Sequence, residues 1–527
     1  MNHEAGWDAL GSPELPPDVG TPWVYDANCQ SGPVPPLYAD TLGRWGLAAH
    51  DAARDLPPTS RGRRWNGHWY VARAVAPVDA PSAAIRPARP VDERWQAEWA
   101  PALAKWLPPW AAWAVVGRTG PELAQLLQQA DDEGPRLLGV AEEIRLAATA
   151  TLGAFHEQYQ PWLTGPRGTS LAPFPSPLLT VGEKPANHET TRALWQLKEA
   201  VEAAGQDTAW LREAILDASP GNLYDTRAAN PAGTVWLGQW DRFLDHHGRR
   251  CDEAGGMGPS WIEDPSVPLR LLQAYLDDTR WPPSDHWDGV QAARDAEEAA
   301  VMGRLPPGTP FLLDVARARQ AHELASHRVD DIVQQVSYRL RRIVAAAGDW
   351  LVGAGLLAQR GDVLFLTRAE CLAALESRAA APAPLHSLVR QRQAEPGPAG
   401  SWMPPPVLGH EGAATPDPAD AWWQGTAGAP GRVRGPVRVV HTLRDAAAAR
   451  PGEIVVARLV TSQWAPGLPL VAGFVAEGGE PYAPGVLTAA EFGVPAVVGM
   501  AGATRHLHSG DWIEVDGRSG TVRRLDA

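Results

Sequence analysis

The spacing of apolar residues changes three times along the chain. Residues 1–90 are rich in proline and show little helical periodicity. Residues 91–385 repeat apolar side chains at spacings of three and four, the period of a helix that buries one face. Residues 386–420 lose this period, and residues 421–527 alternate short β-branched runs with glycine turns. The pattern predicts an entry segment with minor β structure, a helical domain, a linker and a domain of mixed β and α structure.

The helical period is strongest in five stretches, and two glycines mark the end of the fourth. Gly353 and Gly355 predict a helix end, because glycine commonly terminates helices. The following segment, 356–367, reads as a loop and then a short buried strand. In the entry segment, Asn66-Gly67 predicts a turn that leads into a strand. The five helical stretches are 121–133, 142–159, 191–205, 331–357 and 368–380.

The last hundred residues contain six short runs with strand character and one helix-compatible stretch, 486–493. The linker before them is semi-rigid because it carries three consecutive prolines at 404–406. We therefore expect an α+β multidomain chain, with a large, mostly α-helical domain and a C-terminal domain that mixes strands and helices. The six predicted strands lie within 432–440, 452–458, 472–479, 494–500, 511–517 and 520–525.

Composition excludes several classes of function. The chain has 527 residues and a net charge of −14, with no concentration of positive charge, so nucleic acid and anionic membranes are not expected partners. No stretch of about 18 uncharged apolar residues could span a bilayer. The N-terminus lacks the pattern of a secretory signal. Cys29, Cys251 and Cys371 are widely separated, which argues against a disulfide framework. These features predict a cytoplasmic protein.

Tryptophan is unusually common, with 24 residues against seven phenylalanines. Two groups stand beside prolines, at 106–113 and 280–287. Most tryptophans are expected in the core. A minority could line a site for a bulky, largely apolar small molecule, because the indole ring supplies rigid flat area.

The C-terminal segment carries an ordered series of motifs. It begins with Ala429-Pro430-Gly431, continues through Thr461 and Trp464-Ala465-Pro466, and includes Glu491-Phe492-Gly493-Val494-Pro495 and Val515-Asp516-Gly517. This series resembles the mobile, swivelling phosphohistidine domain of phosphoenolpyruvate-utilising enzymes, a β/β/α domain. The resemblance implies that the loop before Glu491 should carry a phosphorylated histidine.

The expected histidine is missing from that loop. Counting back from Glu491 puts Pro484 at the carrier position, and a slip of one residue would put Ala483 or Gly485 there. No histidine lies between residues 442 and 505. Because phosphohistidine chemistry needs an imidazole nitrogen as nucleophile and leaving group, none of these residues can carry phosphate.

A second resemblance lies upstream, in residues 243–269. Gly248 and Arg250 are followed by Trp261 and by Glu263-Asp264-Pro265, a series similar to the helical substrate-binding domain of rifampicin phosphotransferase-like proteins. His247 stands where that family usually has an aromatic residue. The family's ATP-grasp domain and phosphate-binding loops have no counterpart in this sequence, so we expect no nucleotide, metal or other cofactor.

The densest polar cluster lies in the same segment. A histidine beside an arginine can exchange protons, and a guanidinium can hold a carboxylate or another anion. The alternative is a charged helix end whose basic side chains face free carbonyl groups. The resemblance favours a catalytic site. Its predicted residues are His247, Arg250, His246 and Glu253, with Arg249 and Trp261 in substrate binding.

Two further groups are weaker candidates. Glu480 and Tyr482 lie on the loop that the family presents to its substrate, where they could act as acid or base, plug the site or simply form an ordinary loop. His327 and Arg328 stand at helical spacing from Glu323 and are candidates for substrate binding or for an interhelical ion pair.

Three functions remain open. The first is a phosphate-independent enzyme of specialised metabolism that performs dehydration, isomerisation or cyclisation of a bulky, largely apolar molecule between the helical and swivelling domains. The second is a subunit of a split phosphotransferase, with a separate ATP-grasp partner. The third is a protein that binds and sequesters a small molecule without turnover. The sequence leaves a homo-oligomer open.

Overall fold

The structure is a computed structural model of the chain. It describes residues 23–25, 34–54, 60–65, 68–72, 89–163, 177–183, 185–225, 230–251, 258–277, 283–377, 385–394, 407–408 and 422–525. The chain divides into two compact units. The first comprises Met1–Ser82, Leu107–Glu142 and Arg339–Thr415, and the second comprises Ala83–Trp106, Glu143–Tyr338 and Pro416–Ala527.

The first unit contains an antiparallel sheet in the order β2-β3-β1-β4. The strand expected after Asn66-Gly67 is confirmed as β3, while the two turn residues lie outside the described ranges. The strands are β1 (Trp23–Tyr25), β2 (Arg61–Trp65), β3 (His68–Ala72) and β4 (Val407–Leu408). The shorter helices are α1 (Pro36–Tyr38), the π-helical turn η3 (Ala39–Gly43), α2 (Arg44–Ala53), α14 (Arg368–Glu376) and α15 (His386–Gln393).

Two long helices, α5 (Gly120–Leu163) and α13 (Val329–Gly353), include residues of both units. Helix α5 joins two predicted helical stretches into one. Helix α13 ends as expected, with Gly355 in the left-handed region at φ 72°. The strand predicted within 361–367 was wrong, because Arg360–Phe365 form the 3-10 helix η10. The Asp362 carboxylate accepts hydrogen bonds from the backbone amides of Ala358 and Gln359, which satisfies this turn locally without a neighbouring strand.

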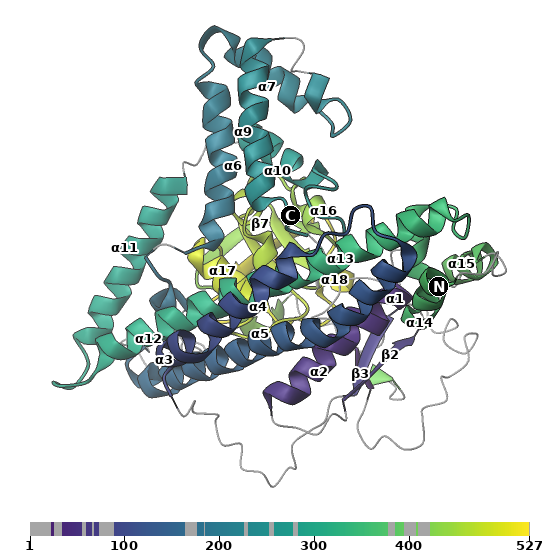
Figure 1. The fold of residues 1–527 in the computed structure, drawn as a ribbon. Coiled ribbons are helices and arrows are strands. Elements are labelled where there is room, and N and C mark those ends of the chain that lie inside the picture. Colours follow the sequence, from purple (N-terminus) through teal and green to yellow (C-terminus); the bar gives the residue numbers. More distant parts are fainter. Residues whose placement is uncertain are drawn as a thin grey trace, which may run out of the picture. The chain divides into compact units, whose positions relative to one another are not determined.

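The helices of the second unit are amphipathic, as the apolar spacing predicts. Helices α6 and α9 run side by side (Figure 1). The helices are α3 (Val91–Arg94), η4 (Trp95–Trp99), α4 (Ala100–Ala112, which continues into the first unit), η5 (Pro177–Thr180), α6 (Asn187–Glu202), η6 (Gly205–Asp207), α7 (Thr208–Leu216), η7 (Leu223–Asp225), α9 (Pro231–His247), α10 (Ser266–Asp277), α11 (Pro283–Met302), α12 (Phe311–Glu323) and η9 (Leu324–Arg328).

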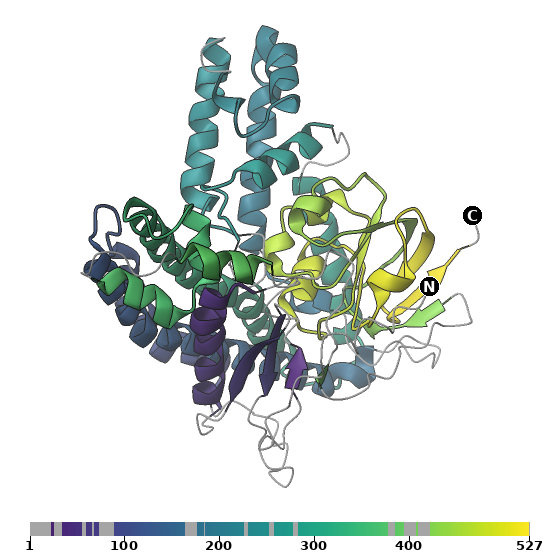
Figure 2. The same ribbon diagram turned by 90° about the vertical axis from the view of Figure 1, so that its right-hand side faces the viewer.

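The C-terminal part of the second unit is built on a mixed eight-stranded sheet in the order β5-β12-β11-β7-β8-β9-β10-β6 (Figure 2). All six predicted strands and the predicted helix are confirmed, and so is the fold class. The strands are β5 (Trp422–Gln424), β6 (Thr426–Ala427), β7 (Arg432–Val439), β8 (Ile454–Ala457), β9 (Gly473–Ala476), β10 (Ala496–Val498), β11 (Trp512–Asp516) and β12 (Thr521–Arg524). The helices are α16 (Leu443–Ala446), η11 (Ser462–Trp464), η12 (Leu468–Leu470), α17 (Pro484–Glu491) and α18 (Ala503–His506).

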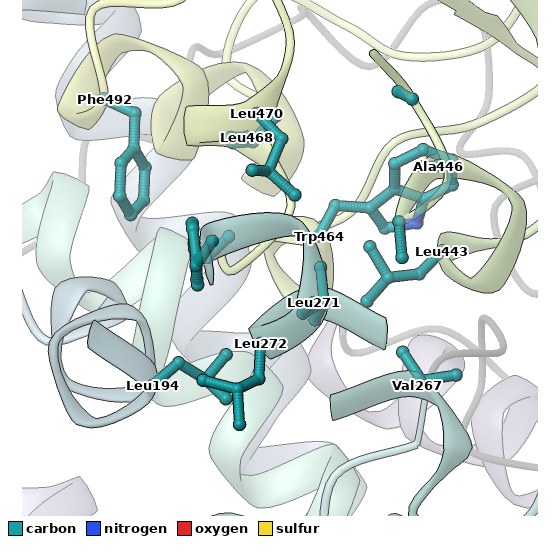
Figure 3. Close-up of a cluster of buried hydrophobic side chains, with 14 of the residues drawn as sticks. Leu194, Val267, Leu271, Leu272, Leu443, Ala446, Trp464, Leu468, Leu470 and Phe492 are labelled. Atoms are coloured by element: carbon teal, nitrogen blue, oxygen red, sulfur yellow. The ribbon is translucent and has the colours of Figure 1, made fainter. Parts of the chain in front are cut away.

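The helices and the C-terminal sheet of the second unit share one hydrophobic core. Leu271 of α10 faces Trp464 of the C-terminal part, whereas Leu272 lies beside Leu194 of α6 (Figure 3). These four side chains are at most 6% exposed. Burying this apolar surface stabilises the contact between the helices and the sheet.

Several tryptophans take part in the core, as the composition suggested. The rings of Trp236 and Trp240 stack within α9, and each is at most 1% exposed. Trp261 is fully buried as well. No helix in the described part of the chain is long and apolar enough to cross a membrane.

We predict that Leu271→Ala lowers the free energy of unfolding by about 2–5 kcal/mol, because it leaves a cavity in the core between α10 and the C-terminal part. Leu312→Ala is the control, since Leu312 is 55% exposed and its truncation should change the free energy by about 0.5 kcal/mol or less. Urea unfolding followed by tryptophan fluorescence measures both variants. Equal stability of the two would contradict the shared core.

Candidate functional site

The predicted pair His247 and Arg250 meets at one hydroxyl group. His247 ends α9, and its Nδ1 lies 3.1 Å from Oγ1 of Thr190 on α6. Arg250 donates from Nη1 to the same oxygen at 3.3 Å. Gly248 permits the tight turn between them, because a side chain there would collide with the carbonyl oxygen of Leu244. The structure therefore brings the two basic side chains together.

Arg250 also links the helical part to the C-terminal part. Its Nη2 donates to the carbonyl oxygen of Ser462, on η11, at 3.5 Å. Its guanidinium carbon lies 5.8 Å from the ring centre of Trp261, within cation–π range. Trp261, predicted to bind substrate, thus lies against Arg250 and is fully buried.

The environment of His247 keeps its imidazole neutral. Burial is the main cause, and the positive charge of Arg250 and the nearby His246 act in the same direction, so the pKa of His247 falls to about 4. At neutral pH the ring therefore offers one N–H donor and one acceptor nitrogen.

The other residues predicted in this segment do not join the pair. His246 is exposed and its Nδ1 lies 2.8 Å from the carbonyl oxygen of Arg242, on its own helix. Arg249 is exposed and lies 6.0 Å from the ring centre of Tyr338. Glu253 lies outside the described residues.

Asp330 is a neighbour of Arg250 that sequence reasoning missed. Burial raises the pKa of Asp330 to about 7, and the charge of Asp331 acts in the same direction, while the charge of Arg250 opposes the shift. A carboxyl group that is half protonated near neutral pH can both donate and accept a hydrogen bond. Its position near the start of a long amphipathic helix gave no signal in the sequence.

His327 and Arg328 lie on the π-helical turn η9, just before α13. Burial is the main cause of a lowered pKa for His327, and its pKa also responds to the charges of Asp331, Arg250 and Glu491. His327 therefore lies within electrostatic range of Arg250. Arg328 instead lies 5.8 Å from the ring centre of Trp95.

The loop expected to carry the phosphohistidine leads into α17. Pro484 is the first residue of that helix, a position that suits proline because its missing N–H would have no helical acceptor. A side chain at Gly485 would lie 2.0 Å from the carbonyl oxygen of Val460, so α17 packs directly against the chain that precedes Ser462. The structure therefore puts the degenerate carrier position close to η11.

The two polar residues of this loop have different surroundings. Glu480 is exposed. The hydroxyl of Tyr482 is buried without a hydrogen-bond partner among the described residues. Burial, together with the negative charge of Glu157, raises the pKa of Tyr482, so the phenol stays protonated.

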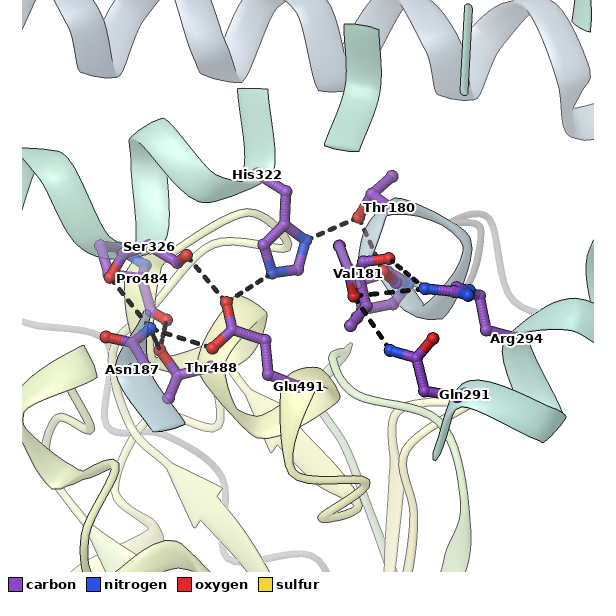
Figure 4. A network of polar contacts seen from close by, with 12 residues as sticks. Thr180, Val181, Asn187, Gln291, Arg294, His322, Ser326, Pro484, Thr488 and Glu491 are labelled. Atoms are coloured by element: carbon purple, nitrogen blue, oxygen red, sulfur yellow. Dashed lines mark hydrogen bonds and ion pairs between the residues drawn. The ribbon is translucent and has the colours of Figure 1, made fainter. Parts of the chain in front are cut away.

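The end of α17 is held by a buried carboxylate that sequence reasoning did not single out. Glu491 accepts hydrogen bonds from Asn187 Nδ2 at 3.0 Å and Ser326 Oγ at 2.9 Å (Figure 4). His322 Nε2 lies 3.0 Å from Glu491 Oε1, the oxygen that also accepts from Ser326. Thr488, one turn earlier, accepts from the same Asn187 amide at 3.1 Å. Three separate helical elements therefore hold α17.

The network continues behind His322. Thr180 Oγ1 donates to the carbonyl oxygen of Pro177 at 2.7 Å, so His322 Nδ1, 2.7 Å from Thr180 Oγ1, donates to it. This arrangement fixes the orientation of the ring that faces Glu491. The spacing of His322 and Ser326, four residues apart on adjoining helical turns, was the only sequence signal for this network.

Burial alone would raise the pKa of Glu491. The hydrogen bond and charge of His322, the charge of His188 and the hydrogen bond from Asn187 outweigh burial and lower the pKa. The ring of His188 also stacks on Phe492 at 4.0 Å, with 8° between the planes. The end of α17 is thus held by polar contacts and by a stacked ring.

We predict that Glu491→Gln lowers the free energy of unfolding at neutral pH by about 1–3 kcal/mol, because the amide replaces a charged acceptor of several hydrogen bonds. A lowered folded pKa stabilises the fold fully above the ordinary pKa of glutamate, and this contribution is lost as pH falls through the folded value. The difference between wild type and variant should therefore shrink in acid. Urea unfolding over a pH series measures it, with exposed Glu480→Gln as control. A difference independent of pH would contradict the assignment.

Comparison with known families finds two matches. Residues 176–329 match the rifampicin phosphotransferase fourth domain, and residues 449–520 match the mobile domain of PEP-utilising enzymes. The first range contains His247, Arg250 and the helical residues around Glu491. The second contains Ser462, Pro484 and Glu491 itself.

Several curated proteins are similar to this chain. A rifampicin phosphotransferase from Streptomyces sviceus is 27% identical over 78% of this chain and 48% of its own length. A chondramide synthase from Chondromyces crocatus is 27% identical over 66% of this chain and 10% of its own length. A prodigiosin synthesizing transferase from Serratia marcescens is 39% identical over 21% of this chain and 12% of its own length.

The chain thus spans about half of the rifampicin phosphotransferases that it matches and a smaller share of the other two proteins. Both matched domains agree with the resemblance expected from the motifs. They confirm that these two regions are similar to phosphoenolpyruvate-utilising, rifampicin phosphotransferase-like proteins.

Proposed function

We propose that this chain is a phosphate-independent enzyme of specialised metabolism. It acts on a bulky, largely apolar small molecule by acid–base chemistry, which would be dehydration, isomerisation or cyclisation, where the helical and swivelling domains meet. One observation carries the proposal. Arg250 of the helical part reaches the backbone of Ser462 beside α17, and the first turn of α17 offers Pro484 in place of an imidazole.

The chemistry of the neighbouring groups fits this proposal. Arg250 can hold an anionic or polar group of the substrate. The neutral ring of His247, oriented through Thr190, can donate or accept a hydrogen bond at a reacting oxygen. Tyr482, on the loop before α17, is assigned as a further acid because its phenol stays protonated. None of these roles requires phosphate transfer.

The relatives support the metabolic setting. Proteins named for chondramide, rifampicin and prodigiosin share segments with this chain, which favours specialised metabolism over central metabolism. The relatives are longer, and fold alone does not fix function, so the reaction type rests on the site residues.

A second function is favoured by one specific observation. Because residues 176–329 match the fourth domain of rifampicin phosphotransferase, the chain could supply the substrate-binding part of a split phosphotransferase. A separate ATP-grasp protein would then provide the phosphate. A protein that only binds its small molecule is the remaining alternative.

Incubation of the purified chain with extracts of specialised metabolites, followed by mass spectrometry, separates these functions. We expect a loss of water or a rearranged product without nucleotide. Phosphorylation by the chain alone with ATP and Mg²⁺ would overturn the proposal. Phosphorylation that requires an added ATP-grasp protein would favour the split enzyme, and retention of an unchanged compound would favour the binding protein.

For the turnover found in this assay, we predict that His247→Ala and Arg250→Ala each reduce kcat/KM by about 100-fold or more, because each removes a group that contacts the reacting molecule. His508→Ala is the matched control, since the side chain of His508 is 75% exposed and remote in sequence from the site. Circular dichroism checks that the variants fold. Unchanged kinetics in both site variants would remove His247 and Arg250 from the reaction.

A further inference from the structure

We propose that Gln334, Ser462 and Asp330 complete, around Arg250, a binding site for a carboxylate group. The substrate class is then a bulky apolar carboxylic acid. That this acid is a substrate rests on the proposed function, whereas its binding site does not depend on turnover.

Gln334 supplies the first argument. Its Oε1 accepts a hydrogen bond from the backbone amide of Cys251, the residue after Arg250, at 3.1 Å. This contact fixes the side chain and leaves Nε2, which can only donate. Nε2 is buried and has no hydrogen-bond partner among the described residues. A fixed, buried donor without an acceptor beside a guanidinium indicates that an acceptor from outside the chain binds there.

Asp330 lies on the same face of α13 as Gln334, because residues four apart are neighbours on a helix. Its Oδ2 is also buried without a partner in the described part of the chain. The charge of Arg250 acts on the ionisation of Asp330, which puts the carboxyl group in the same neighbourhood. The start of α13 therefore carries two unsatisfied polar groups, one on the residue that contacts Cys251 and one on the residue that responds to the charge of Arg250.

Ser462 provides the third group, from the C-terminal part. Ser462 is 1% exposed, its carbonyl oxygen accepts from Arg250, and its Oγ is buried with no partner in the described residues. Each such group costs about 1–3 kcal/mol when it stays unsatisfied. Three of them next to one arginine are best explained by a ligand that satisfies them.

The set of donors selects the ligand chemistry. A guanidinium, an amide N–H and a hydroxyl can all donate to one planar oxyanion, and the fork of an arginine matches a carboxylate. The ring of Trp261, fully buried in the core, lies 5.8 Å from the Arg250 guanidinium carbon and makes this side of the site apolar. These features favour a carboxylic acid with an apolar body over a free phosphate.

The ionisation of Asp330 makes carboxylate binding at this site depend on pH. Burial raises the pKa of Asp330 to about 7. The charge of Arg250, three residues after the end of α9, lowers this pKa, and the charge of Asp331 on its own helix raises it. His327 lies three residues before Asp330 and also responds to Arg250. A bound carboxylate would raise the pKa of Asp330 further, so the neutral acid donates to the ligand. Binding therefore takes up a proton and weakens as pH rises above neutral.

Calorimetric titration of the full chain with naphthoate tests the site, with the neutral isostere naphthamide and with phenyl phosphate for comparison. We expect naphthoate to bind with a Kd of about 1 mM or tighter, and at least tenfold more tightly than naphthamide. Affinity should fall as pH rises through neutrality. Absence of naphthoate binding, equal affinity for the amide, or tighter binding of phenyl phosphate would overturn the carboxylate assignment.

Single variants assign the contacts. Arg250→Met, Gln334→Met and Ser462→Ala should each weaken naphthoate binding by about fivefold or more, while exposed Arg242→Met should leave it unchanged. Asp330→Asn keeps a donor but cannot ionise, so it should bind naphthoate with an affinity independent of pH. Wild-type affinity in Gln334→Met and Ser462→Ala, or an unchanged pH profile in Asp330→Asn, would remove these residues from the site.

The enzyme proposal and the carboxylate-site proposal can be refuted independently of each other. Naphthoate binding with this variant pattern, but no product from metabolite extracts, would leave the carboxylate site in place and reject the enzyme. Turnover of a compound by a chain that does not bind naphthoate would retain the enzyme and reject the site.

Discussion

The buried carboxylate of Glu491 is the constraint on which the arrangement of the second unit depends. A carboxylate without partners could not remain in this interior, because the loss of its hydration is too costly. Its partners come from α6, α12 and η9, so the last turn of α17 fits in one place only. The apolar contacts between α10 and η11 add binding energy to this contact, while the polar network makes it specific.

This constraint also positions the candidate site. Helix α17 is held at its end by Glu491 and packs at its start against Val460. The residues just after Val460 bring the carbonyl oxygen of Ser462 to Arg250. Asn187 and Thr190, one turn apart on α6, serve the two clusters: the first holds Glu491, and the second joins His247 to Arg250. A change in the docking of α17 would therefore alter the site.

The family relationship and the lost histidine have a common interpretation. The swivelling domain retains the sheet, the helix and the close packing expected of a carrier domain, although its loop carries Pro484. Under the proposed function, the polar groups that meet a substrate lie on the helical side, on η11 and, with Tyr482, on the loop before α17. Under the proposed function, the domain serves as one wall of the site and no longer delivers phosphate.

The amino-acid sequence alone determined the family resemblance, the fold class and the six C-terminal strands, because periodicity and ordered motifs are local properties of the chain. It also singled out His247 and Arg250 as candidates, and the structure brings these two side chains to one hydroxyl group. It gave the wrong structure for 361–367, where capping by Asp362 overrides strand propensity. It could not identify Glu491, Asp330, Gln334 or Ser462, which stand in ordinary helical or loop patterns. Only the tertiary structure selected these residues, because burial and missing partners arise when segments distant in sequence pack together.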